Sequence, residues 1–480
     1  MRRIPPLIVI LPVLIGPGRA LADCTVTDLT SLARSDPDYQ ECSPFTSAID
    51  PSYAATCHVL RITCDDENTP YSDEGDILVE LLFTDPGVTA KGAVVLGGGA
   101  GGTDFYETLG ESIATELLVP LLEDGYWIIQ RKWLAPWPGG VGGMRSVSRR
   151  GTAMFGWLKG LDGEPGEPGG INLNGVPLCA TGNSGGAVEI AYGLAYHGLT
   201  ATLDGAVLTS GPPLSDLQKA CWGDDITVFD PPWYAPNVAA DENTPSQVDA
   251  HIWNPDGLCF DDGPEGYGGN GFQFEFTFDL PDNDPPFFFE WYEGILRPQN
   301  QDSVNGTYGQ PPTDGICQVT NPSELERNRL CDDSLACDDW VDQDEFPAYD
   351  YPATKVAFLF GNEDCGVAIP FGLVYATVVT HVGGMAASIT FVDGGGHRLA
   401  TTPSGADAIA EALRYTCNRC EGDANGDGTV DPLDSGFVLA RFGCPLGTGD
   451  PSCDAADQNG DGAVDPLDSG FVLARFGECP

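Results

Sequence analysis

Short apolar runs alternate with helical patterns along the middle of the chain. Runs of this kind, several of which end in glycine, are typical of strands buried on both faces of a sheet. The alternation of strands and helices indicates a mostly parallel sheet covered by helices, so we predict an α/β fold. Expected strands cover 76–83, 93–96, 127–129, 176–180, 206–208, 356–360 and 389–392, and expected helices cover 107–122, 146–158, 186–196 and 406–413.

Two segments depart from this alternation. Residues 23–75 contain four cysteines and few periodic runs, which predicts an N-terminal extension held by disulfides. Residues 211–352 are rich in proline, glycine, aspartate and aromatic residues, and they interrupt the domain expected over 76–417. At this point of such a sheet we expect the insertion to form a cap over the functional site. The alternative is a surface decoration away from the chemistry.

The charge and the first residues bear on where the protein works. A formal net charge of -49 repels nucleic acid and anionic membranes, so we expect neither as a partner. Residues 1–22 combine two early arginines, a short apolar run and an Ala-Leu-Ala sequence, which is the pattern of a cleaved signal peptide. No other stretch approaches the roughly 18 apolar residues of a membrane span. We therefore predict a secreted protein.

The chain contains 16 cysteines, an even number that fits an oxidising compartment. A zinc site formed by Cys417, Cys420, Cys444 and Cys453 is the alternative to disulfides for these four. No histidine lies near them in the sequence, and exported thiols usually pair, which favours disulfides.

Residues 182–186 read Gly-Asn-Ser-Gly-Gly, which is a G-x-S-x-G motif. The motif follows an expected strand and opens an expected helix. In this context the outer glycines permit a sharp turn that lifts the serine hydroxyl out of the strand end. Ser184 is therefore the predicted nucleophile.

A serine nucleophile needs a base, and the base needs a carboxylate that orients it. Among the five histidines, only His397 follows a late expected strand on a glycine-rich loop, so it is the predicted base. Asp364 follows the penultimate expected strand and is favoured as the acid over Glu363, while Asp393 is a weaker rival. The resulting order of serine, aspartate and histidine is that of α/β-hydrolases.

On these residues, the segment 76–413 resembles the α/β-hydrolase superfamily, on its esterase and lipase side. The resemblance implies a carboxylic ester substrate, an acyl-enzyme on Ser184 and no cofactor for catalysis. It also implies backbone donors to the oxyanion at Gly185 and in the glycine-rich loop 97–102, where Gly99 is the expected donor. This loop differs from the H-G-G-G form of esterases, because Leu96 stands at the histidine position.

Two copies of an acidic motif occupy the C-terminal residues 421–480. Oxygen ligands at positions 1, 3, 5, 9 and 12 of a loop, with glycine at position 6 and a backbone carbonyl at position 7, are what a calcium loop requires. We predict two bound Ca²⁺ ions. The expected ligand positions are Asp423, Asn425, Asp427, Thr429, Asp431 and Asp434 in the first copy, and Asp457, Asn459, Asp461, Ala463, Asp465 and Asp468 in the second.

Each loop continues into the same short apolar helix, and neither is preceded by a helix, so the pair is not a pair of EF-hands. Residues 421–480 resemble a type I dockerin, which is a small all-α domain with calcium loops. The resemblance implies docking onto a cohesin-type domain of a scaffold protein, often for polysaccharide degradation. A stalk stabilised by calcium, without such a partner, is the alternative.

Together these features predict a secreted serine hydrolase of carboxylic esters, with a polysaccharide-linked ester as the substrate that the tail suggests. A serine peptidase with the same triad is one alternative. A non-catalytic, calcium-dependent binding protein on a hydrolase scaffold is another, and the presence of Ser184, Asp364 and His397 argues against it.

Overall fold

A computed structural model of the chain provides the structure. The expected signal peptide at 1–22 lies outside the residues that the structure describes, as does most of the insertion at 211–352. The described residues are 24–30, 53, 55–64, 76–110, 112–138, 143–160, 173, 176–213, 215, 217, 249–251, 272–277, 288–291, 334–335, 347–349, 351, 354–361, 364, 372, 375–376, 378–380, 387–417, 422–424, 429–444, 453, 456–458 and 463–478.

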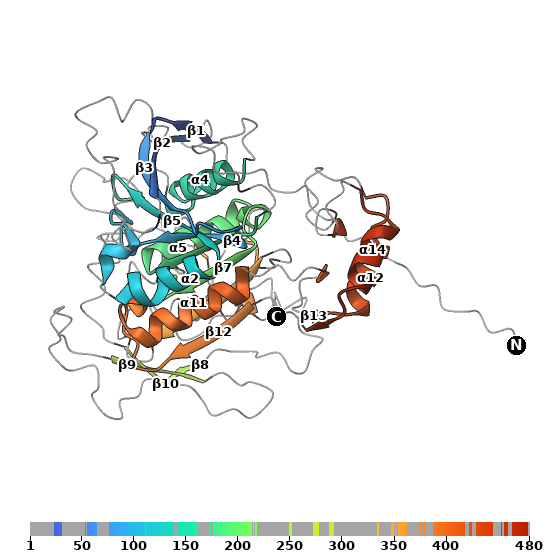
Figure 1. Cartoon of the computed structure of the whole chain (residues 1–480). Coiled ribbons are helices and arrows are strands. Elements are labelled where there is room, and N and C mark those ends of the chain that lie inside the picture. Colours follow the sequence, from blue (N-terminus) through green and yellow to red (C-terminus); the bar gives the residue numbers. More distant parts are fainter. Residues whose placement is uncertain are drawn as a thin grey trace, which may run out of the picture.

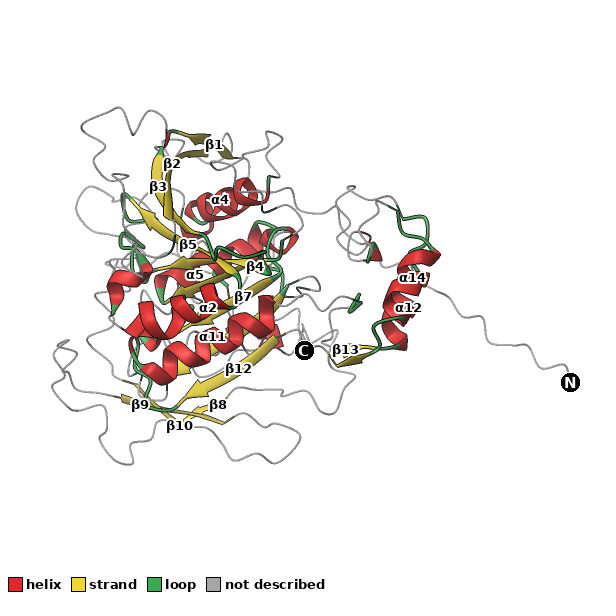
Figure 2. Ribbon diagram, in the orientation of Figure 1, coloured by secondary structure: helices red, strands yellow, loops and turns green. Residues whose placement is uncertain are grey.

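A nine-stranded sheet forms the centre of the molecule (Figures 1 and 2). Neighbouring strands are parallel from the strand at 126–133 across the sheet to the strand at 387–392, whereas the strands at 24–28, 55–64, 77–84 and 126–133 pair antiparallel. The predicted α/β fold with a largely parallel sheet is therefore confirmed. In spatial order the strands are β1 (Cys24–Asp28), β2 (Ala55–Cys64), β3 (Ile77–Thr84), β5 (Tyr126–Trp133), β4 (Gly92–Gly97), β6 (Leu178–Asn183), β7 (Gly205–Thr209), β11 (Lys355–Gly361) and β12 (Ala387–Val392).

Helices cover both faces of this sheet, and the sheet separates two apolar cores. On β4, Ala93 and Val95 belong to the core on one face, while Val94 and Leu96 belong to the core on the other. Successive side chains of a strand point to opposite faces, so one continuous apolar run contributes to both cores. The first face carries α3 (Met144–Val147), α4 (Arg149–Lys159) and α5 (Gly185–Tyr196), and the second carries η2 (Ile113–Leu118), α2 (Val119–Glu123) and α11 (Pro403–Cys417).

The helix expected over 107–122 is divided into three pieces. A 3-10 turn η1 (Tyr106–Leu109) precedes the π-helix η2, which passes directly into α2. Pro120 lies in the first turn of α2 and has no N–H group, so an unbroken α-helical ladder cannot run through this point. Two further 3-10 turns, η3 (Leu199–Ala201) and η7 (Leu399–Thr401), connect later elements.

The cysteine-rich segment contributes two strands that the sequence pattern does not reveal. Strands β1 and β2 extend the antiparallel side of the sheet, and a disulfide joins Cys24 to Cys64, which face each other in the register. In the insertion, β8 (Asp249–His251), β9 (Phe272–Thr277) and β10 (Phe288–Trp291) form a separate antiparallel sheet.

Near the C-terminus, α12 (Pro432–Leu439) and α14 (Pro466–Leu473) lie side by side, apart from the sheet (Figure 1). The short strand β13 (Thr429–Val430) pairs with β14 (Gly477–Glu478), so residues before the first helix meet residues after the second. The two repeats therefore pack as one small unit, whose buried apolar residues are Ala424, Val430, Val438, Ala456, Val464 and Val472.

Candidate active site

Ser184 occupies the tight turn between β6 and α5. Its φ of 50° and ψ of -109° lie in a region that residues other than glycine rarely adopt. The turn is held on both sides, because the Ser184 N–H donates to the Thr209 carbonyl at 2.9 Å and the Val188 N–H donates to the Ser184 carbonyl at 3.0 Å. The surrounding structure thus fixes a strained serine at the end of a strand.

The outer glycines of the motif face each other across this turn. A Cβ on Gly182 would lie 2.3 Å from the carbonyl carbon of Gly186, and a Cβ on Gly186 would lie 2.7 Å from the Gly97 carbonyl oxygen. No real Cβ approaches another atom so closely. The motif requires glycine at both positions because three backbone segments touch here.

The loop 97–102 follows β4 and lies against the start of α5. A Cβ on Gly99 would lie 3.6 Å from the Ser184 Cβ, and a Cβ on Gly185 would lie 2.1 Å from the Ala100 carbonyl oxygen. The structure therefore brings Gly99 and Gly185, the two expected oxyanion donors, close to Ser184. Ala100 has a φ of 48° and also lies against the turn, which the sequence does not indicate.

His397 and Asp364 meet where the loops after β11 and β12 touch. His397 Nδ1 lies 3.2 Å from Asp364 Oδ1 and 3.1 Å from Oδ2. The Asp364 side chain is fully buried, while about a third (36%) of the His397 side chain is exposed. A buried carboxylate beside Nδ1 stabilises the tautomer that carries its proton there, which leaves Nε2 as the acceptor.

All three residues follow the carboxyl ends of strands in the parallel part of the sheet. Strand β6 pairs with β7, β7 with β11 and β11 with β12, so these ends lie at one edge. The same edge holds all three non-glycine residues with positive φ among those described, Ala100, Ser184 and Ser210. Strain of this kind is tolerated only where neighbours over-determine the backbone, and it gathers at functional sites.

The alternatives for the acid and the base lie elsewhere or outside the described residues. Asp393 is exposed, and its backbone carbonyl accepts a hydrogen bond from the Ser404 hydroxyl at 3.2 Å. Glu363 is not among the described residues. His58 is buried on β2 against Phe83, and His197 Nε2 contacts the Arg145 carbonyl at 2.7 Å, so neither is placed like His397.

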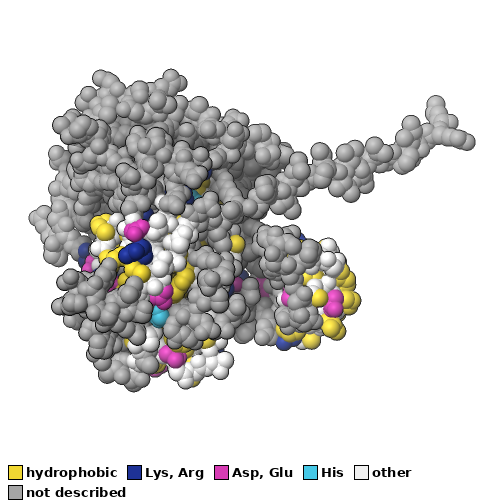
Figure 3. Space-filling view, turned by 90° about the horizontal axis from the view of Figure 1, so that it is seen from above, with side chains coloured by type: hydrophobic (Ala, Val, Ile, Leu, Met, Phe, Trp, Pro, Cys, Tyr) yellow, Lys and Arg dark blue, Asp and Glu magenta, His cyan; other side chains and the backbone are white. Residues whose placement is uncertain are grey.

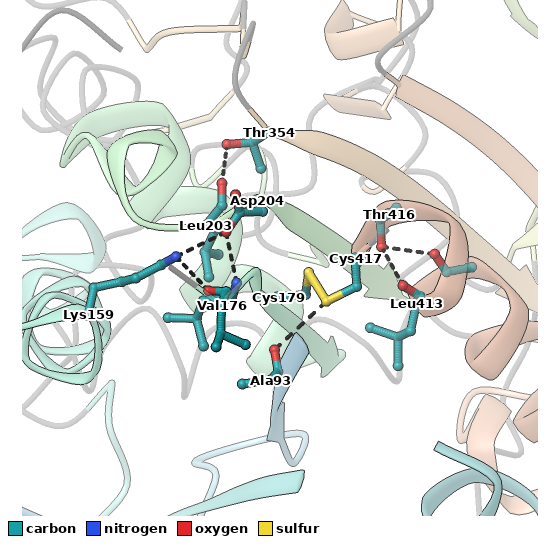
Figure 4. Close-up of a disulfide and its surroundings, with 12 residues drawn as sticks. Ala93, Lys159, Val176, Cys179, Leu203, Asp204, Thr354, Leu413, Thr416 and Cys417 are labelled. Carbon is teal, nitrogen blue, oxygen red and sulfur yellow. Dashed lines mark hydrogen bonds and ion pairs between the residues drawn. A yellow bond between two sulfur atoms is a disulfide. The ribbon is translucent and has the colours of Figure 1, made fainter. Parts of the chain in front are cut away.

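A disulfide between Cys179 and Cys417 links the strand before Ser184 to the end of α11 (Figure 4). It crosses 238 residues of sequence, which explains why spacing alone does not reveal it. A second disulfide joins Cys444 to Cys453. Because Cys417, Cys444 and Cys453 are paired in this way, the zinc alternative is wrong for these cysteines.

The C-terminal loops are described only in part. Asp434 and Asp468, the last expected ligand of each loop, are fully buried. Each accepts the N–H of the residue that caps its helix, Asp431 or Asp465, at 2.8 Å. A buried carboxylate at this position fits a calcium ligand, although capping alone also uses it.

Asn425, Asp427, Asn459 and Asp461 lie outside the described residues. Within the described part of the chain, no three acidic, histidine or cysteine side chains gather closely enough to hold a metal ion. The two calcium loops, with Asp423, Thr429, Asp457 and Ala463 at their remaining positions, stay a prediction. In the same part of the chain, no helix has the length and apolar character needed to cross a bilayer.

Comparisons with known proteins concern the fold. No protein-family model matches the chain, and no curated protein matches it. One similar solved structure is an esterase of Pyrococcus furiosus, with 11% identity over 77% of this chain and 95% of that chain and a TM-score of 0.35. An acylaminoacyl peptidase of Pyrococcus horikoshii has 10% identity over 76% and 48% of the two chains, with a TM-score of 0.34.

A truncated carbohydrate esterase from gut microbiota has 11% identity over 71% of this chain and 91% of that chain, with a TM-score of 0.35. A monoglyceride lipase of Saccharomyces cerevisiae, in a soluble variant, is a further similar structure. The similar structures are thus esterases, lipases and peptidases. Identities this low do not transfer an activity or a substrate to this chain.

Proposed function

We propose that this chain is a serine hydrolase that cleaves carboxylic esters through an acyl-enzyme on Ser184. The observation that carries the proposal is the contact of His397 Nδ1 with the buried Asp364 carboxylate, at the sheet edge where Ser184 is held in a strained turn. A hydroxyl, an imidazole and a carboxylate in this order are what nucleophilic catalysis on a carbonyl requires.

In the proposed reaction, His397 Nε2 takes the proton of the Ser184 hydroxyl as its oxygen attacks the ester carbonyl. The imidazolium that forms is stabilised by Asp364, and it then protonates the departing alcohol. Water, deprotonated by the same imidazole, attacks the acyl-enzyme and releases the acid. The Asp364 carboxylate keeps its charge throughout and serves to orient and stabilise the ring.

The backbone N–H groups of Gly185 and of Gly99 are the proposed donors to the oxyanion of the tetrahedral intermediate. The packing of Gly185 against Ala100 supports their convergence near Ser184. A preset donor of this type contributes about 3 kcal/mol to stabilisation of the transition state.

The experiment begins with the purified full chain and a fluorophosphonate probe, followed by identification of the labelled peptide. We expect labelling at Ser184, and its loss in Ser184→Ala. Short and long p-nitrophenyl esters, acetylated xylan and a panel of peptides are then compared as substrates. Turnover of peptides without ester turnover would replace the esterase by the serine peptidase, and labelling at another serine would remove Ser184 as the nucleophile.

We further propose that the chain is secreted and that its C-terminal repeats bind two Ca²⁺ ions. The buried Asp434 and Asp468 support this, together with the acidic residues that precede them in each loop. Calcium would neutralise carboxylates whose mutual repulsion otherwise opposes closure of the loops. Titration of the chelated full chain with Ca²⁺ should give two sites, and Asp434→Asn or Asp468→Asn should each remove one. An unchanged stoichiometry in both variants would contradict these ligands.

The C-terminal repeats also carry a duplicated apolar surface that supports docking to a cohesin-type scaffold. Hydrophobic side chains, in yellow, gather on the small lobe at the right of Figure 3. Leu433 and Leu467, at matching positions of the two repeats, are 66% and 64% exposed. Further matching pairs are Leu439 with Leu473 and Phe442 with Phe476, all exposed. Apolar surface left open in this way marks an interaction site.

Binding of the full chain to a panel of cohesin domains, with Ca²⁺ and after chelation, tests the docking. The double variant Leu433→Asp and Leu467→Asp should abolish binding, whereas Val88→Asp, at a position 61% exposed on the sheet domain, should not. If no cohesin binds while two ions do, the tail is a calcium-stabilised stalk and the scaffold proposal falls.

A further inference from the structure

A buried ion pair lies beside the loop 97–102. Arg131 Nη2 on β5 is 2.9 Å from Glu189 Oε2 on α5, and the two side chains are only 3% and 2% exposed. The indole N–H of Trp133 donates to the same carboxylate oxygen at 3.3 Å. Removing two charges from water costs about as much as their attraction returns, so stability alone does not account for this pair.

Glycine backbone packs against both charged groups. A Cβ on Gly97 would lie 2.0 Å from Arg131 Nη2, and a Cβ on Gly102 would lie 2.5 Å from Arg131 Nη1. The guanidinium therefore fills the space beneath both ends of the loop 97–102. On α4, a Cβ on Gly151 would lie 2.5 Å from Glu189 Oε1, so glycine at this position leaves room for the carboxylate.

The pair joins the two elements that carry the proposed oxyanion donors. Glu189 lies one helical turn after Gly185 on α5, and Arg131 is the register partner of Gly97 at the start of the loop. The far end of the loop is fastened to the same strand, because the Trp133 N–H donates to the Gly102 carbonyl at 2.8 Å. A shift of the loop relative to α5 would therefore disturb the contacts of the guanidinium.

The pair is not arranged for the largest number of hydrogen bonds. Arg131 Nη1 and Glu189 Oε1 are buried without a hydrogen-bond partner among the residues that the structure describes. Buried polar atoms in this state are unfavourable for folding. Each charged group thus keeps one unsatisfied atom next to the loop, which indicates that the pair serves the position of the loop and not stability.

We propose that Arg131 and Glu189 are positioning residues, which hold the loop 97–102 against α5 so that its donor and the Gly185 N–H converge on the oxyanion. The inference rests on the proposed ester hydrolysis. Neither side chain touches the substrate. A donor displaced by about 1 Å loses much of its effect on the transition state, which corresponds to roughly a 10- to 100-fold loss of rate.

The test compares Arg131→Lys and Glu189→Gln with a matched control at the amino ends of the parallel strands. Lys159 Nζ lies 3.1 Å from Asp204 Oδ2 in another largely buried pair, which Figure 4 shows, and Lys159→Met breaks it. We expect the two test variants to lower kcat roughly 10- to 100-fold with KM within about twofold. They should also weaken binding of a boronic acid, which mimics the tetrahedral intermediate, by the same factor. Lys159→Met should lower Tm and leave kcat unchanged.

A double variant, Arg131→Met with Glu189→Leu, replaces any single variant that does not fold, because it leaves no unpaired charge in the core. Wild-type kcat and boronate affinity in folded variants would make the pair purely structural and overturn the inference. Failure of the proposed function is seen separately, as ester hydrolysis that persists in Ser184→Ala before any of these variants is made.

Discussion

The two ends of the parallel sheet around β6 differ in how their groups are satisfied. At the carboxyl end, Ser184 is strained and the Arg131–Glu189 pair keeps unsatisfied atoms. At the amino end, Lys159 donates to the Val176 carbonyl at 3.0 Å and to Asp204, which in turn accepts the Leu178 N–H at 2.8 Å. One end of the same strand stores strain, whereas at the other end Lys159 and Asp204 bond to each other and to the backbone.

The amino end is also tied covalently. Figure 4 shows the disulfide from Cys179 to Cys417 beside the network of Lys159 and Asp204, with Thr354 bonded to the Leu203 carbonyl at 2.7 Å. A backbone can keep an unfavourable turn only if the rest of the structure holds it there. We infer that the contacts at the amino end stabilise the fold, which allows the carboxyl end to keep a strained turn. Substitutions at the amino end should therefore lower stability, and substitutions at the carboxyl end should lower kcat.

The largest effect that separates the two ends is expected for Asp364→Asn. This substitution loses the charge that stabilises the imidazolium and favours the wrong tautomer of His397, so kcat should fall by about 10⁴-fold while Tm changes little. Steady-state kinetics and thermal unfolding of the same preparation measure both. Asp393→Asn, the matched control on the neighbouring loop, should lower kcat by less than about tenfold. The reverse ranking, with both variants folded, would assign the acid to Asp393.

At the amino end, removal of a disulfide should produce the opposite result. Replacing Cys179 and Cys417 together by alanine removes a cross-link between residues 238 positions apart in the sequence. This should lower the free energy of unfolding by about 2–5 kcal/mol. Ester turnover at 25 °C should remain near wild type. Chemical denaturation and kinetics check the two parts. A large loss of kcat in the folded variant would show that the amino end serves the chemistry directly and would break the contrast between the two ends.

Relief of the strain at Ser184 gives a smaller effect. Ser184→Ala keeps a Cβ and therefore the strained backbone, whereas Ser184→Gly removes the strain. Such strain destabilises the folded state by about 1–3 kcal/mol. Glycine loses some of this gain through the entropy of its unfolded state. Ser184→Gly should still unfold at a higher denaturant concentration than Ser184→Ala. The control is Ser404 in helix α11, where Ser404→Gly should be less stable than Ser404→Ala. If Ser184→Gly were less stable than Ser184→Ala by as much as glycine is less stable than alanine at Ser404, the turn would store no strain.

Much of this arrangement follows from local sequence. The strands that lead to Ser184 and Asp364 are buried on both faces, and the strand that leads to His397 alternates apolar residues with exposed polar ones. Both patterns indicate strands, so their order along the chain and the common edge at their carboxyl ends are predictable. The turn at Ser184 is predictable because the motif places glycine at the two positions, 182 and 186, where the structure has no room for a Cβ. The contact of His397 with Asp364 agrees with the sequence-based choice, although its distance comes only from the structure.

Other features depend on contacts between distant segments and leave no local signal. Strand β2 mixes His58, Arg61 and threonines with apolar residues, which hides its place in the sheet. Arg131 stands between Gln130 and Lys132 in β5, where a charge normally indicates exposure, and only the spatial approach of Glu189 explains its burial. The pairing of Cys179 with Cys417 likewise depends on the packing of α11 against β6.

The smallest expected effect concerns the antiparallel edge, far from the proposed chemistry, where Asp28 on β1 meets His58 on β2. Asp28 Oδ2 lies 3.5 Å from His58 Nδ1, and the Thr30 N–H donates to Asp28 Oδ1 at 2.7 Å. Partial burial acts to raise the pKa of Asp28, but the hydrogen bonds with His58 and Thr30 outweigh it and lower the pKa to about 2. The carboxylate is therefore favoured in the folded state.

A folded-state pKa below the ordinary value of 3.8 means that the stabilisation is complete above pH 3.8 and is lost as the pH falls through about 2. Because 35% of the Asp28 side chain is exposed, solvent screening limits the contribution to about 1 kcal/mol or less. Asp28→Asn should lower Tm by about 1 °C at pH 5 and by less near pH 2.5, while ester turnover stays unchanged. Asp76→Asn, in the exposed pair with Arg61, is the control and should show no such difference. Equal Tm differences at both pH values for Asp28→Asn would mean that the carboxylate charge does not stabilise this edge.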